Sequence, residues 1–184
     1  MRKVIAAINM TLDGYCDHTA IDPDQEIHDH YTELLQGGEV ILYGRATYEL
    51  MEFWKPFVKK PSGERSMDDF AQAIDRIRKM VFSRTLKSVD WHSARLADRS
   101  LEEAVRDLKA QNGGDIFVGS RSLIIQLMKL DLLDELQLCI HPVIAGSGMQ
   151  LFESMSTRKM LKLERTKTFR GGAVIMYYSP IKAM

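Results

Sequence analysis

Val40-Ile41-Leu42-Tyr43-Gly44-Arg45 is the stretch that decides the fold. Four consecutive apolar residues are typical of a strand that is covered on both faces of a sheet. Gly44 ends this run, and residues 45–52 carry apolar side chains at the spacing of a short helix. A buried strand that passes through a tight turn into a helix is the repeating unit of α/β proteins. The stretch therefore predicts an α/β fold.

The same unit is repeated on both sides of this stretch. Residues 4–8 are apolar at every position, which indicates a central strand, and residues 79–83 and 115–118 are predicted as further strands. Capping-box patterns begin at Ser66 and Ser100, each with an acidic residue three positions later, and they indicate where two helices start. The polar segments expected to be long loops are residues 9–24 and 55–65.

The apolar pattern changes toward the end of the chain. From Leu136 onward apolar and polar residues alternate, which is typical of strands with one wetter face. The turn sequence Arg170-Gly171-Gly172-Ala173 separates two such segments and predicts a closing antiparallel hairpin. Together these patterns predict a single three-layer α/β/α domain with a mixed sheet over residues 1–184, without internal repeats or low-complexity tracts.

The composition argues against several classes of ligand. The 25 basic and 25 acidic side chains cancel, and no dense run of Lys or Arg marks a nucleic-acid arm. No apolar run approaches the roughly 20 residues of a transmembrane helix, and Asn9 and Asp13 interrupt the apolar start before it resembles a signal peptide. Cys16 and Cys139 are too few for a disulfide framework. We therefore expect a soluble, cytoplasmic protein that acts on a small molecule, not on nucleic acid or a membrane.

Three predicted strands end in one or two small residues followed by an arginine. These ends are Tyr43-Gly44-Arg45, Phe82-Ser83-Arg84 and Val118-Gly119-Ser120-Arg121. Open α/β sheets bind ligands at the carboxyl ends of their strands, where helix N-termini offer free N–H groups. Small residues let a phosphate approach the backbone, and arginine recognises its charge. The pattern favours a phosphorylated nucleotide; the alternative is that Gly and Ser only form tight turns while the arginines lie in solvent.

Other motifs of nucleotide, metal or nucleophile chemistry are absent or weak. No GxGxxG follows residues 4–8, no Walker A lysine is present, and Gly146-Ser147-Gly148 lacks the third glycine. His28 and His30 are two positions apart in a predicted helix, so they point about 200° apart and cannot easily bind one metal. No motif ties Cys139 to a base. We expect neither a metal site nor a cysteine nucleophile.

Four short segments, taken in their order along the chain, resemble the dihydrofolate-reductase-like family. They are residues 3–14, 41–48, 116–120 and 133–136. Residues 141–148, followed by Leu151-Phe152, are similar to one branch, typified by the C-terminal reductase domain of bacterial bifunctional riboflavin-biosynthesis deaminase-reductases. The resemblance runs from Lys3 to about Tyr178. It implies an eight- or nine-stranded mixed sheet, NADPH bound across the strand ends, and a homodimer.

The resemblance also implies which residues hold the cofactor. Gly44, Arg45 and Thr47 match the family's GRxT turn, which holds a cofactor phosphate. Ser83 and Arg84 match the strand end beside the adenosine 2′-phosphate. The glycine-rich turn at the pyrophosphate is matched by Gly119, Ser120, Arg121 and Ser122. The family often has two adjacent glycines where this chain has Gly119-Ser120. This departure would restrict how closely the backbone can approach the cofactor.

The same resemblance places the reacting ring of the substrate near the first strand and the first helix. Asn9, Thr11 and Asp13 match the first-strand motif, which implies Asp13 and Asn9 in catalysis and Thr11 in substrate binding. The first-helix position that contacts the pterin in dihydrofolate reductases falls near His28, with Asp29 beside it, so these two are also expected to bind substrate. That match is loose, which argues against dihydrofolate itself. For Asp13 the alternative is a turn-forming residue without contact to substrate.

The resemblance thus implies an NADPH-dependent reductase that transfers hydride to a small heterocyclic or sugar-phosphate substrate. One candidate substrate is 5-amino-6-(5-phosphoribosylamino)uracil, a pyrimidine intermediate of riboflavin synthesis. Against it stands the absence of a deaminase motif, HxE with a downstream PCxxC, ahead of this domain. Two alternatives are a regulatory module that binds the nucleotide without turnover and a reductase of the dihydrofolate type.

Overall fold

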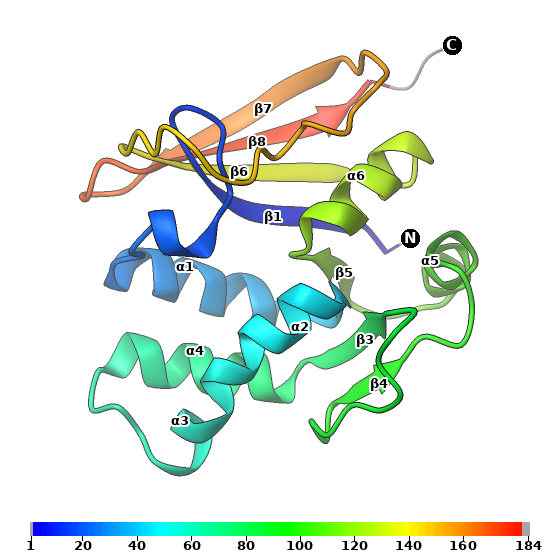
Figure 1. Ribbon diagram of the computed structural model, residues 1–184, viewed down its shortest axis with the longest axis horizontal. Coiled ribbons are helices and arrows are strands. Elements are labelled where there is room, and N and C mark those ends of the chain that lie inside the picture. The colour runs from blue at the N-terminus through cyan, green and yellow to red at the C-terminus, as the bar shows by residue number, and fades with distance from the viewer. Residues whose placement is uncertain (1, 182–184) are drawn as a thin grey trace.

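The computed structural model describes residues 2–181, whose strands form an eight-stranded sheet (Figure 1). The strands are β1 (Val4–Thr11), β2 (Gly38–Gly44), β3 (Arg78–Phe82), β4 (Ala94–Leu96), β5 (Asp115–Val118), β6 (Glu135–His141), β7 (Leu161–Thr168) and β8 (Val174–Pro180). Their order in the sheet is β4-β3-β2-β5-β1-β6-β8-β7. All neighbours are parallel except β8, which runs antiparallel to β6 and β7. The predicted mixed sheet is confirmed.

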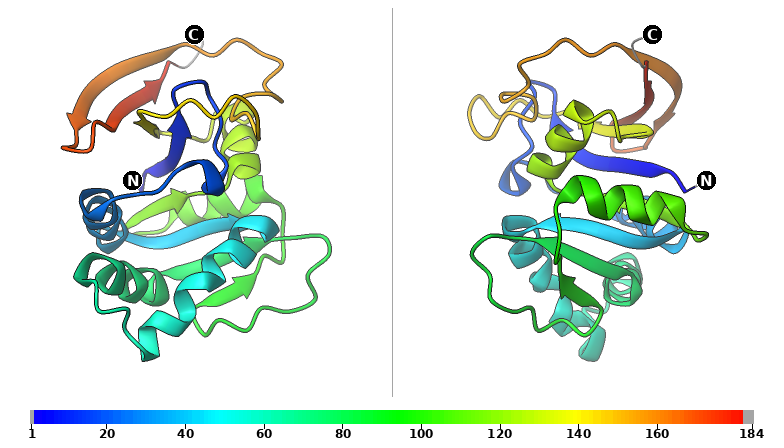
Figure 2. Two further views of the ribbon diagram at one scale, coloured as in Figure 1. Left: turned by 60° about the vertical axis from the view of Figure 1, so that its left-hand side comes forward. Right: turned by 90° about the vertical axis from the view of Figure 1, so that its right-hand side faces the viewer.

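Helices cover both faces of the sheet (Figure 2). The helical elements are η1 (His18–Ala20), α1 (Gln25–Gln36), α2 (Arg45–Met51), η2 (Glu52–Trp54), α3 (Lys55–Lys59), α4 (Arg65–Arg76), α5 (Leu101–Ala110) and α6 (Arg121–Lys129). One apolar core lies under α5 and α6, and a second lies under α1 and α4. This arrangement is the predicted three-layer α/β/α fold. Within residues 2–181, no helix has the length and apolar character needed to cross a membrane.

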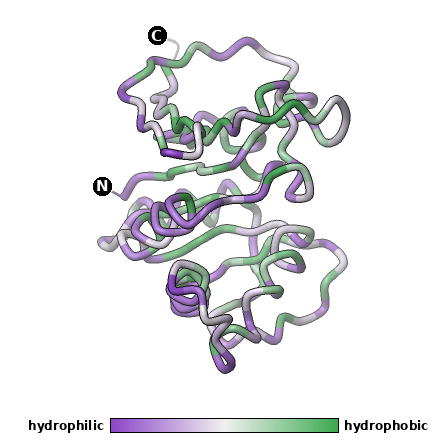
Figure 3. The backbone as a smooth tube through the Cα atoms, turned by 90° about the vertical axis from the view of Figure 1, so that its left-hand side faces the viewer, coloured by the Kyte–Doolittle hydropathy of each residue, from purple (hydrophilic) through white to green (hydrophobic). Residues whose placement is uncertain are grey.

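Alternation along the central strands explains the two cores. Val4 and Ala6 of β1 join the core under α5 and α6, whereas Ile5 joins the core under α1 and α4. Successive side chains of a strand point to opposite faces, so an uninterrupted apolar run fills both cores. Figure 3 shows hydrophobic residues along strands in the middle of the molecule and mixed residues along the helices.

The chain closes on the predicted antiparallel hairpin of β7 and β8. Phe169 N donates to Ala173 O at 2.9 Å, and Gly172 N donates back to Phe169 O at 3.0 Å. Gly172 has a φ of +85°, which L side chains rarely adopt, so the turn requires a glycine there. β7 forms the edge of the sheet, and residues 162–168 are all exposed.

The two predicted capping boxes have different outcomes. At Ser100 the box is confirmed, because its hydroxyl accepts from Glu103 N at 3.3 Å and the Glu103 carboxylate accepts from Ser100 N at 3.0 Å. At Ser66 the prediction is wrong, because α4 begins one residue earlier and Ser66 is buried inside it. The Asp68 carboxylate instead accepts from Ser62 N at 2.7 Å and closes the preceding turn.

Two segments predicted as loops contain regular structure. β1 continues through Asn9 to Thr11, because β6 lies beside it and pairs these residues with Cys139 and His141. Residues 55–65 include the short helix α3. Strand β4 was missed as well, since its three residues at the sheet edge are too few to show a period.

Candidate functional site

The carboxyl ends of β2 and β5 lie side by side and are joined by a serine hydroxyl. Gly44 N donates to Ser120 Oγ at 2.8 Å. A Cβ atom on Gly44 would make ordinary contact with Ser122 Oγ at 3.4 Å and Ser120 Oγ at 3.8 Å, so the space between the strand ends does not by itself require a glycine. Ser120 is buried. At the position where the family often has a second glycine, the serine hydroxyl therefore links two strands.

Two helices begin directly at these strand ends. α2 starts after Gly44 and α6 starts after Ser120, and neither helix has a side chain that caps its first N–H groups. Such N–H groups lack partners within the helix and attract anions. Gly119 adds no bulk, although a Cβ atom there would make only ordinary contact, at 3.7 Å, with the Tyr43 ring. The ends of β2 and β5 therefore fit the phosphates of a dinucleotide.

Two predicted cofactor residues present exposed charges. Arg45 is exposed, and its Nε lies 4.0 Å from the Glu49 carboxylate, which leaves most of its donors unused. Arg84 is exposed and forms no ion pair with any other residue in the range 2–181. Thr47 is half-buried on α2, in the turn that follows Gly44. Arg45 and Arg84 are thus available to a phosphate group.

Two other predicted cofactor residues are bound within the protein. Ser83 Oγ accepts from Leu86 N at 3.0 Å and so closes its own turn. Arg121 Nε donates to Gln150 O at 2.7 Å, and its Nη2 lies 3.2 Å from the Glu153 carboxylate. The Ser83 contact matches the alternative in which serine only forms a tight turn, whereas Arg121 does not lie in solvent, as that alternative expected, but is bound to another segment of the chain. Contact of Ser83 or Arg121 with a cofactor stays a prediction.

A hydrogen-bonded group of Asn9, Tyr31, Cys139 and His141, which we name the Asn9 cluster, lies where β1 and β6 end. Asn9 Oδ1 accepts from Tyr31 OH at 3.0 Å and from His141 Nε2 at 3.0 Å. Cys139 Sγ lies 3.5 Å from the same His141 nitrogen. Strand pairing places Asn9 beside Cys139, and α1 supplies Tyr31 across that face. Because β1 is the neighbour of β5, the cluster lies beside the phosphate-fitting strand ends.

Hydrogen-bond chemistry fixes the protonation of the Asn9 cluster. A carboxamide oxygen only accepts, so Tyr31 OH and His141 Nε2 both carry the hydrogens that they share with Asn9. Burial lowers the pKa of His141, which favours the neutral ring, and raises the pKa of Cys139 to about 12, which keeps it a thiol. Asn9 Nδ2 has no hydrogen-bond partner among residues 2–181. The amide N–H groups therefore remain available as donors.

Asp13 is hydrogen-bonded to the segment that follows β6. Its carboxylate accepts from Ala145 N at 3.1 Å and from Gly146 N at 2.7 Å. The buried Thr11 also donates to it at 2.6 Å, and this hydrogen bond is the main reason that the pKa of Asp13 falls to about 2. The contacts match the turn-forming alternative for Asp13. Direct contact of Asp13 or Thr11 with substrate stays a prediction.

His28 and Asp29 lie outside the Asn9 cluster. The His28 ring packs against Trp54 and Phe70, with ring centroids 5.6 and 5.8 Å apart, and burial lowers its pKa. Asp29 is exposed. In the described part of the chain, no hydrogen bond joins either side chain to the cluster. Their contact with substrate stays a prediction, and the first-helix residue that the structure does bring to the cluster is Tyr31.

Tyr31 and His141 are site residues that the sequence patterns did not indicate. Tyr31 belongs to the apolar stripe of a helix, where a tyrosine is expected to pack, and His141 opens the segment 141–148 that served to assign the branch. The hydrogen bond between His141 and Asn9 joins residues 132 positions apart. No local pattern reports such a pair, although the glycine-rich segment after His141 indicated that this strand end is unusual.

Comparison with known proteins identifies relatives along nearly the whole chain. The profile of the RibD C-terminal domain matches residues 2–177. The uncharacterized protein YyaP of Bacillus subtilis (strain 168) is 34% identical, covering 96% of this chain and 94% of YyaP. A putative riboflavin biosynthesis protein from Shewanella sp. PV-4 superposes with a TM-score of 0.72 at 17% identity, covering 99% of this chain and all of that chain. A pyrimidine reductase-like protein from Corynebacterium diphtheriae gives 0.72 at 17% identity, covering 99% and 93%. At such identity the two structures support the fold alone.

Proposed function

The chain belongs to the RibD C-terminal domain family, and on that premise we propose that it is a reductase that transfers hydride from NADPH to a small heterocyclic or sugar-phosphate substrate. The family consists of reductases that use NAD(P)H generally. The proposal rests on one observation, which is that two different kinds of strand end lie side by side at the carboxyl ends of neighbouring strands. The ends of β2 and β5 fit phosphates, and the neighbouring end of β1 carries the Asn9 cluster.

NADPH would supply the hydride when bound, and the protein would supply position and charge. The uncapped N–H groups at the starts of α2 and α6 would hold the phosphates of the cofactor. Arg45 and Arg84 would pair with the 2′-phosphate, which NADH lacks. The protein is therefore expected to bind NADPH more tightly than NADH.

Asn9 is the residue that we assign to substrate. Its Nδ2 group would donate a hydrogen bond to a carbonyl oxygen or a ring nitrogen and so orient the substrate ring. Tyr31 and His141 would act as positioning residues, because their hydrogen bonds to Oδ1 stop the amide from rotating. A donor that is already fixed needs no reorganisation when the substrate reacts.

The first substrate to test is 5-amino-6-(5-phosphoribosylamino)uracil, whose pyrimidine ring offers carbonyl oxygens to the Asn9 amide. Purified protein is mixed with NADPH and either this compound or dihydrofolate, and NADPH oxidation is followed by absorbance. Oxidation with the pyrimidine supports the proposal. Quenching of NADPH fluorescence without oxidation in either mixture favours the regulatory module, and oxidation with dihydrofolate alone favours a dihydrofolate-type reductase.

We also propose that the protein works as a homodimer. Strand β7 is a long, exposed sheet edge that includes Leu163, 49% exposed, and such edges tend to be covered. Light scattering at micromolar concentration should give twice the chain mass of 21.0 kDa. A mass of one chain would contradict the proposal.

A further inference from the structure

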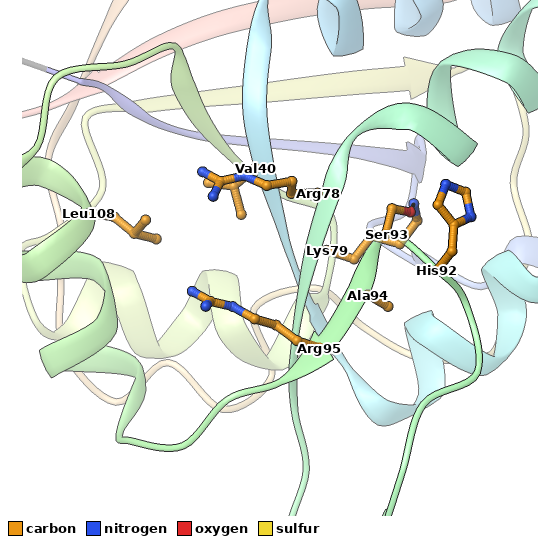
Figure 4. A pocket seen from close by; sticks show the side chains of 8 residues that line it. All are labelled: Val40, Arg78, Lys79, His92, Ser93, Ala94, Arg95 and Leu108. Atoms are coloured by element: carbon orange, nitrogen blue, oxygen red, sulfur yellow. Dashed lines mark hydrogen bonds between the residues drawn. The ribbon is translucent and has the colours of Figure 1, made fainter.

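A cavity lies at the opposite ends of the strands from the Asn9 cluster, which is at their carboxyl ends. It has a volume of about 250 Å³ and opens beside α5 where β2, β3 and β4 begin (Figure 4). Its lining includes Val40 near the start of β2, Arg78 at the start of β3 and Leu108 on α5. The residues assigned to cofactor and substrate follow the carboxyl ends of their strands. The cavity is therefore separate from the proposed reductase site.

Two arginines reach the cavity from neighbouring strands. Arg95 pairs with Met80 in the register of β3 and β4, and Arg78 precedes Met80 by two positions. Alternation places Arg78, Met80 and Arg95 on one face of the sheet, the face that α5 covers. Figure 4 shows both guanidinium groups extending in the same direction, toward Leu108. The geometry thus brings two planar cations to one opening.

The positive charge at this place exceeds the negative charge. The Glu39 carboxylate is shared between Arg78 and Arg2, and Arg2 Nη2 lies 3.3 Å from it. Arg2 is only 3% exposed, its Nη1 donates to Leu108 O at 3.5 Å, and its Nη2 lacks a hydrogen-bond partner in residues 2–181. Arg95 has no ion pair in the same range. Hydrogen bonds from Arg99 and, less strongly, the charge of Arg95 lower the pKa of the nearby Asp98 carboxylate. The two carboxylates of Glu39 and Asp98 therefore face the three guanidinium groups of Arg2, Arg78 and Arg95.

The other basic residues of the lining are engaged elsewhere. Lys79 Nζ donates to Ser93 Oγ at 2.7 Å and to Ile77 O at 3.0 Å, and it lies 4.0 Å from the centre of the Trp91 ring. His92 Nδ1 lies 3.7 Å from the Asp75 carboxylate. A ligand would therefore meet Arg78 and Arg95 as its cations.

We propose that this cavity binds a small phosphate-bearing molecule. The forked guanidinium groups of Arg78 and Arg95 would hold the phosphate oxygens, and Val40 and Leu108 would contact the apolar part of the molecule. The volume is slightly below the 300–1,000 Å³ that is typical of ligand pockets, which limits the ligand to a small one. Binding neutralises the excess of cations beside the buried Arg2.

Inorganic phosphate is the probe for the test, added to the full chain at an ionic strength held constant with chloride. The dissociation constant is measured by the rise in melting temperature with phosphate concentration. Arg95→Gln should weaken phosphate binding about tenfold, because it removes a charge-assisted pair. Arg65→Gln, which removes an exposed charge on α4, should leave it unchanged, and Arg84→Gln reports separately on any phosphate that binds at the proposed cofactor site. Arg95→Gln breaks no ion pair of the described chain, so its folding is not at risk.

Three results would overturn the proposal. Unchanged phosphate affinity in Arg95→Gln would show that the cavity does not bind phosphate. Equal weakening in Arg95→Gln and Arg65→Gln would show an adventitious ion only, held by general positive charge. Weakening in Arg84→Gln alone would place the phosphate at the ends of β2 and β5 and would leave the proposed reductase site standing.

Discussion

The phosphate-fitting ends of β2 and β5 and the Asn9 cluster differ in where their chemistry resides. At β2 and β5 the polar groups are mostly backbone N–H groups, and a serine hydroxyl holds the strand ends together. In the Asn9 cluster the polar groups are side chains, and one amide oxygen accepts from two of them. Backbone N–H groups remain when a side chain is replaced, whereas a shared acceptor is lost when the side chain that carries it is replaced. We therefore expect single substitutions to damage the Asn9 cluster more severely.

Lowering the pH should affect the region around the Asn9 cluster before it affects the ends of β2 and β5. The resulting fall in the free energy of unfolding is the largest effect that we expect. Burial, with smaller contributions from Lys167 and Arg165, lowers the pKa of His30, which precedes Tyr31 on α1, from 6.5 to about 4. Between these pH values the unfolded chain binds a proton that the folded chain excludes, so the free energy of unfolding falls as the pH is lowered. The loss should reach about 3 kcal/mol by pH 4.

Urea unfolding at several pH values between 7 and 4 measures this loss. His30→Phe keeps a ring beside Phe169, which lies 5.6 Å from the His30 ring, and removes the titration. The variant should lose most of the pH dependence, and a variant that keeps it would assign acid sensitivity to other groups. Because His30 adjoins Tyr31, acid should also weaken turnover before it weakens NADPH binding.

Asn9→Ala tests the shared acceptor directly. Loss of an oriented donor typically lowers turnover by two to three orders of magnitude, and we expect about a hundredfold, or about 2.7 kcal/mol. The affinity for NADPH should stay within about twofold. The matched variant in the other region is Ser122→Ala, which should alter neither quantity by more than about threefold, because backbone N–H groups remain there. A parallel loss of NADPH affinity in Asn9→Ala would show that the cluster supports the whole site.

The same difference explains how much of the molecule the sequence could predict. The strand ends at Gly44 and Gly119 follow apolar runs and precede helices, so all their signals lie within a few neighbouring residues. The Asn9 cluster depends on the pairing of β1 with β6, whose residues are far apart along the chain. That pairing also carried β1 three residues beyond the apolar run at residues 4–8. Alternation within each strand predicts which side chains share a face, but it does not predict which strands are neighbours.

Helix starts show the same limit on a smaller scale. The pattern at Ser100 formed its capping box because Glu103 had no stronger competing partner. At Ser66 the residue three positions later, Asp69, accepts instead from Arg65 Nε at 3.3 Å, while the turn at Ser62 engages the Asp68 carboxylate through three hydrogen bonds and α4 begins before the serine. Local propensity thus decides a helix start only where no neighbouring residue competes for the same side chain.

Among the proposed cofactor residues, which we expect to be less sensitive to substitution than the Asn9 cluster, Arg84→Ala is the exception, because recognition of a 2′-phosphate needs a side-chain charge. Hydrogen bonds between charged groups would favour NADPH over NADH by roughly ten- to a hundredfold at the proposed site. The variant should bind NADPH at least about tenfold more weakly and should bind NADH unchanged, as measured by fluorescence titration. Arg65→Ala, which also removes one exposed arginine, should leave both affinities unaltered. Equal dissociation constants for the two cofactors in the unmodified protein would contradict the assignment.

Asp13→Asn should have the smallest effect, a loss of turnover of about tenfold with NADPH affinity unchanged and a melting temperature within a few degrees. The substitution keeps the size of the side chain but leaves one oxygen where the carboxylate now receives Thr11, Ala145 and Gly146. Asp17→Asn is its matched partner, because the Asp17 carboxylate accepts from Met149 N farther along the same segment. Both oxygens of Asp13 are already occupied by the protein, so we expect the two variants to lose turnover equally, as anchors of one segment. A loss confined to Asp13→Asn would instead place Asp13 in contact with the substrate.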